Sequence, residues 1–229
     1  MNRILLSFLL FFAAPTLAAD NVAILERAFE NISSDFHEDW AFTLSEMEDG
    51  VATVGRYDPR LPAGTRWQLL TVDGREPDAE EVADYQDDRE DDFDDDRDDD
   101  NVMDIVDVES IELVEETDDY WIFSFTPDIG DDEDGVAQKI MEKVNGTAKV
   151  IRDGHYLEYL DMRSEKPVRP IFSVKISQFL THIAFGPAND DGPIVPLSID
   201  VEVKGRAALV IKIDERESTR YSDYEYAGT

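Results

Sequence analysis

The chain has 229 residues, with 54 acidic and 21 basic side chains, a formal net charge of −33 and no cysteine. So much negative charge repels nucleic acid and anionic lipid headgroups, and we therefore exclude a nucleic-acid-binding role. The lack of cysteine excludes a disulfide framework, a catalytic thiol and lipid attachment through a cysteine.

The first 19 residues have the pattern of a secretory signal peptide. Arg3 provides a positive start, residues 4–12 are apolar, and small residues precede candidate cleavage sites after Ala18 or Ala19. The apolar run is much shorter than the ~20 residues that cross a bilayer, and no second run approaches that length. The sequence therefore predicts an exported protein that does not span a membrane. An exported chain without cysteine favours the bacterial periplasm.

Residues 20–100 are predicted to form a helix, three strands and a second helix. Apolar residues recur at helical spacing over 20–32, and strands are expected at 39–47, 51–57 and 66–72. Residues 76–86 have the acidic first turn of a helix. The acidic low-complexity segment 87–100 follows. We expect it to be frayed or disordered, because aspartate forms helices poorly and like charges repel.

The rest of the chain is predicted to be mostly strands. After strands 105–114 and 120–125 and a short helix at 136–144, the expected strands are 146–151, 156–163, 172–185, 197–204, 207–213 and 219–226. Residues 197–204 alternate apolar and polar side chains, which is typical of an antiparallel sheet with one buried face. The apolar face of 172–185 changes phase near Ser177 and Gln178, which predicts a β-bulge there.

Long bent strands are typical of strongly curved sheets. The predicted fold class is therefore α+β: a strongly curved antiparallel sheet forming an unclosed β-barrel, with helices covering its concave side. No linker divides the chain, so residues 20–229 are predicted to form one domain.

No motif for catalysis or metal binding is complete. A calcium-binding loop read from Gly130 has glycine at position one and Met141 at position twelve, where a bidentate glutamate is needed. A nucleophile elbow and a zinc-protease motif are absent, and three histidines are scattered along the chain: His37, His155 and His182. We predict a protein that is not an enzyme and has no cofactor or metal site.

Large aromatic side chains are the remaining candidates for a binding site. They could form a packed core, or they could line an apolar cavity between a curved sheet and its helices that takes an acyl chain. On the second interpretation, the candidate ligand-binding residues are Phe42, Trp67, Trp121, Phe123, Phe172, Phe179 and Phe185.

The order of these predicted elements, together with segments 67–77 (WQLLTVDGREP) and 220–226 (RYSDYEY), resembles the periplasmic outer-membrane lipoprotein carrier superfamily, the LolA-like proteins. The resemblance covers essentially the whole chain after the signal peptide. It implies a helix-lidded, unclosed β-barrel around an apolar cavity, and a periplasmic protein that binds a lipid or a lipoprotein acyl chain.

The acidic segment 87–100 departs from the pattern of this superfamily. The superfamily also includes envelope-stress sensors. The resemblance therefore leaves an alternative function, that of a non-enzymatic envelope sensor or interaction protein whose acidic segment docks a basic protein partner.

Overall fold

A computed structural model describes residues 15–95, 102–128, 136–208 and 211–228. Its helices are α1 (Pro15–Glu30), α2 (Phe36–Asp39), α3 (Ala79–Asp95), α4 (Val136–Met141) and the 3-10 helix η1 (Val102–Ile105). Its strands are β1 (Trp40–Glu48), β2 (Val51–Tyr57), β3 (Trp67–Val72), β4 (Val106–Glu116), β5 (Tyr120–Pro127), β6 (Val144–Ile151), β7 (Tyr156–Ser164), β8 (Val174–Pro187), β9 (Ile194–Ala207) and β10 (Ile211–Tyr226).

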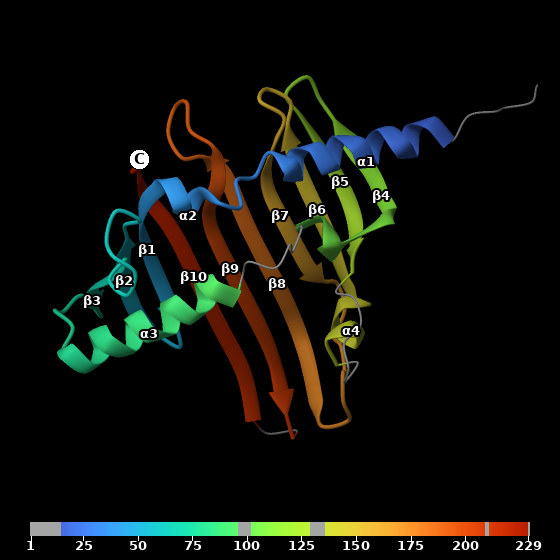
Figure 1. Cartoon of the computed structure of the whole chain (residues 1–229). Coiled ribbons are helices and arrows are strands. Elements are labelled where there is room, and N and C mark those ends of the chain that lie inside the picture. Colours follow the sequence, from blue (N-terminus) through green and yellow to red (C-terminus); the bar gives the residue numbers. More distant parts are fainter. Residues whose placement is uncertain (1–14, 96–101, 129–135, 209–210, 229) are drawn as a thin grey trace, which may run out of the picture.

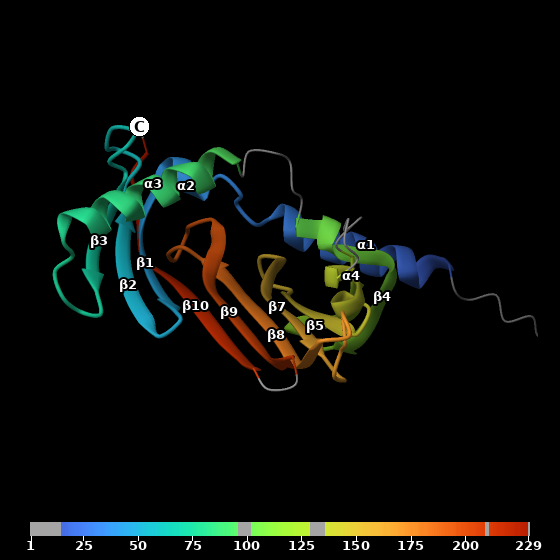
Figure 2. The same ribbon diagram turned by 90° about the horizontal axis from the view of Figure 1, so that it is seen from below.

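The strands form one ten-stranded antiparallel sheet in the order β3-β2-β1-β10-β9-β8-β7-β6-β5-β4. β3 and β4 are its two edges, so the sheet does not close into a barrel. Figures 1 and 2 show that it curves into a trough, with α1 near one end of the strand order and α3 near the other. The prediction of a curved, unclosed antiparallel sheet is confirmed at this level.

The larger core lies between α1 and the β4–β8 half of the sheet. Leu25, Ala28 and Phe29 form one stripe of α1, as the helical spacing of apolar residues predicts. They pack in one cluster with buried residues of the neighbouring elements, namely Met103, Val106, Ile111, Phe123, Phe125, Ala148, Val150, Leu157, Leu160 and Phe185. The helix begins at Pro15 rather than residue 20. Residues 1–14 of the predicted signal peptide lie outside the described part of the chain.

A second, aromatic core lies at the β3 end of the sheet. Its buried members are Phe42, Leu44, Tyr57 and Trp67, and the side chains packed around them are Phe36, Tyr85, Tyr221 and Tyr224. The ring of Phe42 stacks on Tyr57 at 5.3 Å between centroids and meets Trp67 edge-on at 5.7 Å. These are favourable aromatic geometries.

The helix α3 continues to Asp95, so disorder, one of the two expected states of this segment, is wrong for residues 87–95, whereas fraying of the helix end stays a prediction. A capping box starts this helix: the Asp78 carboxylate accepts from the backbone N–H of Glu81, and the Glu81 carboxylate accepts from the N–H of Asp78. Contacts between α3 and the sheet then oppose the repulsion among the acidic side chains of the helix. The Gln86 amide donates to the carbonyl of Trp67 at 2.9 Å, and Arg89 forms an ion pair with Glu46. Residues 96–101 lie outside the described part of the chain.

Tyr85 brings α3 into close contact with β2. Its hydroxyl lies directly over Gly55, where a Cβ atom would stand only 2.1 Å from the Tyr85 oxygen. The guanidinium of Arg89 lies 5.4 Å from the centre of the Tyr85 ring. Burial raises the pKa of the Tyr85 phenol to about 12.

This raised pKa makes stability depend on pH at the alkaline end. The folded protein keeps the phenolic proton above pH 10, whereas the unfolded chain loses it there, so the contribution of Tyr85 is full below pH 10 and is lost as the pH rises through about 12. Relative to Tyr85→Phe, the wild-type protein should lose about 1 kcal/mol of unfolding free energy between pH 9 and pH 11. Urea unfolding of both proteins measures this difference. Parallel pH curves would contradict the buried position of the hydroxyl.

The predicted bulge in β8 is confirmed. The register of β8 against β9 shifts between Ile176 and Gln178, and Ser177 is the extra residue. Ile176 pairs with Gly205 and Phe179 pairs with Val203, two residues away on β9. The bulge therefore places both apolar sets of β8 on one face of the sheet. The strand itself begins at Val174 rather than at residue 172.

The prediction of two strands at 207–213 and 219–226 is wrong. β9 extends to Ala207, and a single strand, β10, runs from Ile211 to Tyr226. Gly205, which follows the predicted strand 197–204, lies inside β9 opposite the bulge of β8. The polar residues 214–218, which separate the two predicted strands, pair in unbroken register with β9.

In the described part of the chain, no helix is long and apolar enough to cross a membrane.

Candidate functional site

The register of the middle strands assembles a row of apolar side chains on one face of the sheet. Leu160 of β7 pairs with Ile183 of β8, and Ile183 pairs with Ile199 of β9. Directly paired residues in antiparallel strands have side chains on the same face. Leu160 is part of the core beneath α1, so this row lies on the face that carries α1.

The same face also carries α3. Ile199 pairs with Thr219 of β10, and Tyr221 stands two residues further along that strand, on the same face. Tyr221 packs against the aromatic core, which Tyr85 of α3 also contacts. The two helices thus lie on one face, with the middle strands β8, β9 and β10 between them.

Between the two helices, this face presents apolar side chains that are only half-buried. We call them the apolar strip: Phe179, Ile183, Ile199, Val201 and Val203. Among the described elements, α1 packs mainly on β4 and β7, and α3 packs mainly on β3, so the middle strands receive little helical cover. A partly buried apolar row on a curved sheet is suited to an elongated apolar ligand.

The expectation that 197–204 has one buried and one exposed face is therefore wrong. All eight residues are half-buried. None of the described helices packs closely on the apolar face, while ion pairs shield the polar face: Arg220 contacts Asp200 at 2.8 Å, and Lys204 pairs with Glu202. Alternation in a sequence reports which residues share a face, but a second layer decides how deeply that face is buried.

The structure divides the seven predicted ligand-binding residues among four places. Phe123 and Phe185 are buried beneath α1, with Trp121 packed against the same cluster. Phe42 and Trp67 belong to the aromatic core, and Phe179 lies in the apolar strip. Phe172 lies in the loop before β8 and its side chain is 101% exposed. The seven residues thus do not line one common surface.

The aliphatic residues of the apolar strip are not among the predicted ligand-binding residues. Ile199, Val201 and Val203 were interpreted as core because they alternate with polar side chains. Their exposure depends on where α1 and α3 pack, which no local pattern encodes. The available signal was the phase change of β8, which predicts a bend in the middle of the sheet.

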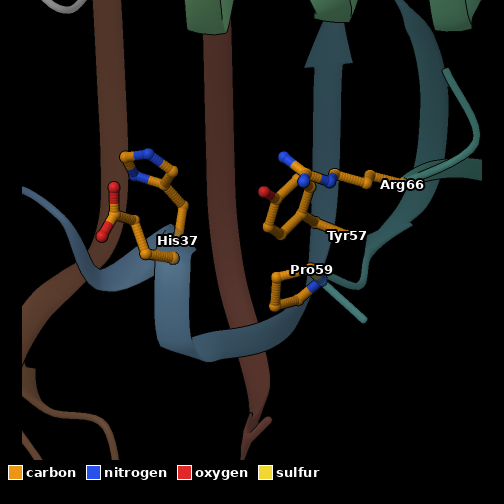
Figure 3. Close-up of a pocket in the computed structure, with 5 residues that line it drawn as sticks. His37, Tyr57, Pro59 and Arg66 are labelled. Carbon is orange, nitrogen blue, oxygen red and sulfur yellow. The ribbon is translucent and has the colours of Figure 1, made fainter. Parts of the chain in front are cut away.

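A polar pocket of about 240 Å³ lies beside the aromatic core. Figure 3 shows His37 from α2, Tyr57 at the end of β2, Pro59 after it, and Arg66 just before β3. Glu38 of α2 also lines this pocket. Burial raises the pKa of the Tyr57 phenol, while the hydrogen-bonded guanidinium of Arg66 opposes this shift. Tyr57 is thus protonated at neutral pH. The Tyr57 phenol and the Arg66 guanidinium could each donate a hydrogen bond to a small polar group in this pocket, next to the Glu38 carboxylate.

The polar face of the sheet holds a histidine–carboxylate pair. Nδ1 of His182 lies 2.6 Å from Oδ1 of Asp161, directly across the β7–β8 ladder. His155 instead contacts the carbonyl of Ile24 at 3.1 Å, which ties its turn to α1. The first contact joins β7 to β8 and the second joins the turn at His155 to α1, so both stabilise the fold. Within the described residues, no group of three histidine or carboxylate side chains could hold a metal ion. The incomplete calcium-loop pattern that begins at Gly130 lies partly outside that part of the chain.

Comparison with known proteins found no matching family model, no matching curated protein and no matching solved structure. The resemblance to the LolA-like superfamily stays a prediction from the sequence.

Proposed function

We propose that this chain is a periplasmic lipid- or lipoprotein-binding protein and that its apolar strip holds an acyl chain. In this proposal, α1 and α3 flank the concave side of the sheet, and the ligand lies between them along β8 and β9. The observation that carries it is the half-buried state of the five apolar side chains of the strip. Each methylene that leaves water on such a surface contributes about 0.8 kcal/mol, so an acyl chain supplies a sufficient driving force.

The two helices are attached in ways that suit access to the strip. α1 is fixed by fully buried side chains such as Leu25 and Ala28. α3 is fixed partly by polar contacts, including the Arg89–Glu46 ion pair and the Gln86 hydrogen bond, which exchange with water at lower cost than an apolar core. In the proposed mechanism, α3 is the element that moves to admit a ligand.

Native mass spectrometry of the purified exported protein, followed by lipid extraction, tests the proposed function directly. We expect a bound phospholipid or acylated peptide. An unliganded mass, together with no uptake of added fatty acid or phospholipid, would contradict lipid binding. That outcome would favour the alternative, in which the acidic segment docks a basic protein partner.

Replacing Val201 by aspartate should weaken binding of a fluorescent fatty acid at least about tenfold, because a charge on the strip would have to be desolvated against the acyl chain. Displacement titration measures the dissociation constant. The matched control is Ser198→Asp, which adds the same charge to the same strand on the opposite face and should change binding less than about twofold. Equal weakening by both variants would show that the strip does not contact the ligand.

A further inference from the structure

Basic residues are concentrated at one end of the middle strands. Segments 166–176 and 205–213 contain no acidic residue, although about one residue in four of the whole chain is acidic. We call their five cationic residues the basic tip: Lys166, Arg169, Lys175, Arg206 and Lys212. All five are exposed. Figure 1 shows that the start of β8, the end of β9 and the start of β10 lie together at the lower end of the sheet.

The strand register places three of these cations side by side. Lys175 of β8 pairs directly with Arg206 of β9, and Arg206 pairs with Lys212 of β10. Like charges opposite one another destabilise a sheet. Lys212 forms an ion pair with Asp214, but no carboxylate among the described residues pairs with Lys175 or Arg206. Within the described residues, the fold thus leaves two adjacent cations without a paired carboxylate, although the chain has a large excess of carboxylates.

Exposed apolar side chains surround these cations. Phe172 is 101% exposed, Ile211 is 60% exposed and Ile171 is 46% exposed. The N–H of Val174 donates to the carbonyl of Ile171, and Val174 and Ile211 both pair with Ala207, so all three apolar residues lie at the same end of the sheet. A protruding aromatic ring beside aliphatic and basic side chains is the composition of surfaces that dock in a membrane interface.

We propose that this end of the sheet docks on a bilayer that contains anionic lipids. Phe172, Ile171 and Ile211 enter the headgroup region, while the cations of the basic tip contact lipid phosphates. The charge of the whole chain repels such a surface, but at physiological ionic strength this repulsion is screened beyond about 8 Å. Cations in contact with the phosphates therefore attract the protein to the bilayer more strongly than the distant carboxylates repel it. Repulsion of the acidic rest of the molecule also orients the protein with this end toward the bilayer. The proposal goes beyond acyl-chain binding and does not depend on it.

Flotation with vesicles tests this proposal. At physiological ionic strength, the exported protein should bind phosphatidylcholine vesicles containing one quarter phosphatidylglycerol at least about tenfold more tightly than pure phosphatidylcholine vesicles. The double variant Lys175→Gln/Arg206→Gln should weaken binding about 25-fold, because each cation near the surface contributes about fivefold. Phe172→Ser should weaken it severalfold without changing the fold. Removing the adjacent cations should leave the melting temperature unchanged or raise it.

Arg27→Gln in α1 is the matched control for a single Arg206→Gln substitution. Arg27 is exposed, has no ion pair among the described residues and undergoes the same change of charge, so vesicle binding should not change. Equal binding to both kinds of vesicle, or equal loss in Arg27→Gln and Arg206→Gln, would overturn the proposal. A dimer that Phe172→Ser dissociates, without vesicle binding by the wild type, would assign this end to a second copy and would also overturn it. Val201→Asp should retain vesicle binding, which separates this proposal from the proposed function.

Discussion

Replacement of Phe123 by alanine should lower the free energy of unfolding by about 3–5 kcal/mol. Phe123 is fully buried in the middle of β5, where it pairs with Ala148 of β6 and belongs to the cluster beneath α1. Deleting its ring removes apolar surface from the core and leaves a cavity that the paired strands cannot collapse to fill. Urea unfolding at neutral pH, followed by circular dichroism, measures the loss.

The matched control for this prediction is Phe172→Ala. It is the same chemical change, and Phe172 is likewise a sequence-predicted ligand-binding residue, but its ring is fully exposed. The unfolding free energy of this variant should stay within about 0.5 kcal/mol of wild type. Similar losses in the two variants would mean that the packing beneath α1 is not the main core of the protein.

Replacement of Gly205 by alanine should lower the free energy of unfolding by about 1–3 kcal/mol, although only one methyl group is added. A Cβ atom at this position would lie 2.5 Å from the carbonyl oxygen of Lys175 and 3.2 Å from the Cα of Ile176. Both are backbone atoms of β8, so relief requires the strands to separate. Because Gly205 faces the bulge of β8, the substitution also opposes the bend that gives β8 its single apolar face.

Thermal and urea unfolding of Gly205→Ala measure this effect, with Ser198→Ala as the control on the same strand. Ser198 is half-buried, and the control should change the unfolding free energy by about 0.5 kcal/mol or less. An unchanged stability in Gly205→Ala would contradict the close approach of β8 and β9 at the bulge.

Where local patterns agree with tertiary contacts, the elements are predicted well. The stripe of Leu25, Ala28 and Phe29 predicts the buried face of α1, and the phase change in β8 locates its bulge at Ser177. Where local chemistry and tertiary contacts oppose each other, tertiary contacts prevail. Residues 87–95 are helical despite the poor helix propensity of aspartate, and Gln86 and Arg89 attach the middle of α3 to the sheet.

The candidate site was only partly predictable for a related reason. Aromatic residues were favoured because they are large, yet Phe123 is buried core and Phe172 projects into solvent. The smaller Val201 and Ile199 lie on the half-exposed strip. Side-chain size and alternation do not indicate which layer covers a face, since that depends on contacts between residues far apart in the chain.

By itself, the sequence determined that the protein is strongly acidic and lacks cysteine, that most of the chain after residue 100 forms antiparallel strands, and that β8 bends at a bulge. These properties follow from composition and from side-chain periodicity over a few residues. Only the tertiary structure decided that the middle strands lie between two separate cores, that their apolar face is half-exposed, and that Lys175, Arg206 and Lys212 stand side by side. The physical reason is that strand pairing and helix packing join residues tens of positions apart, and those contacts alone determine burial and the grouping of charge.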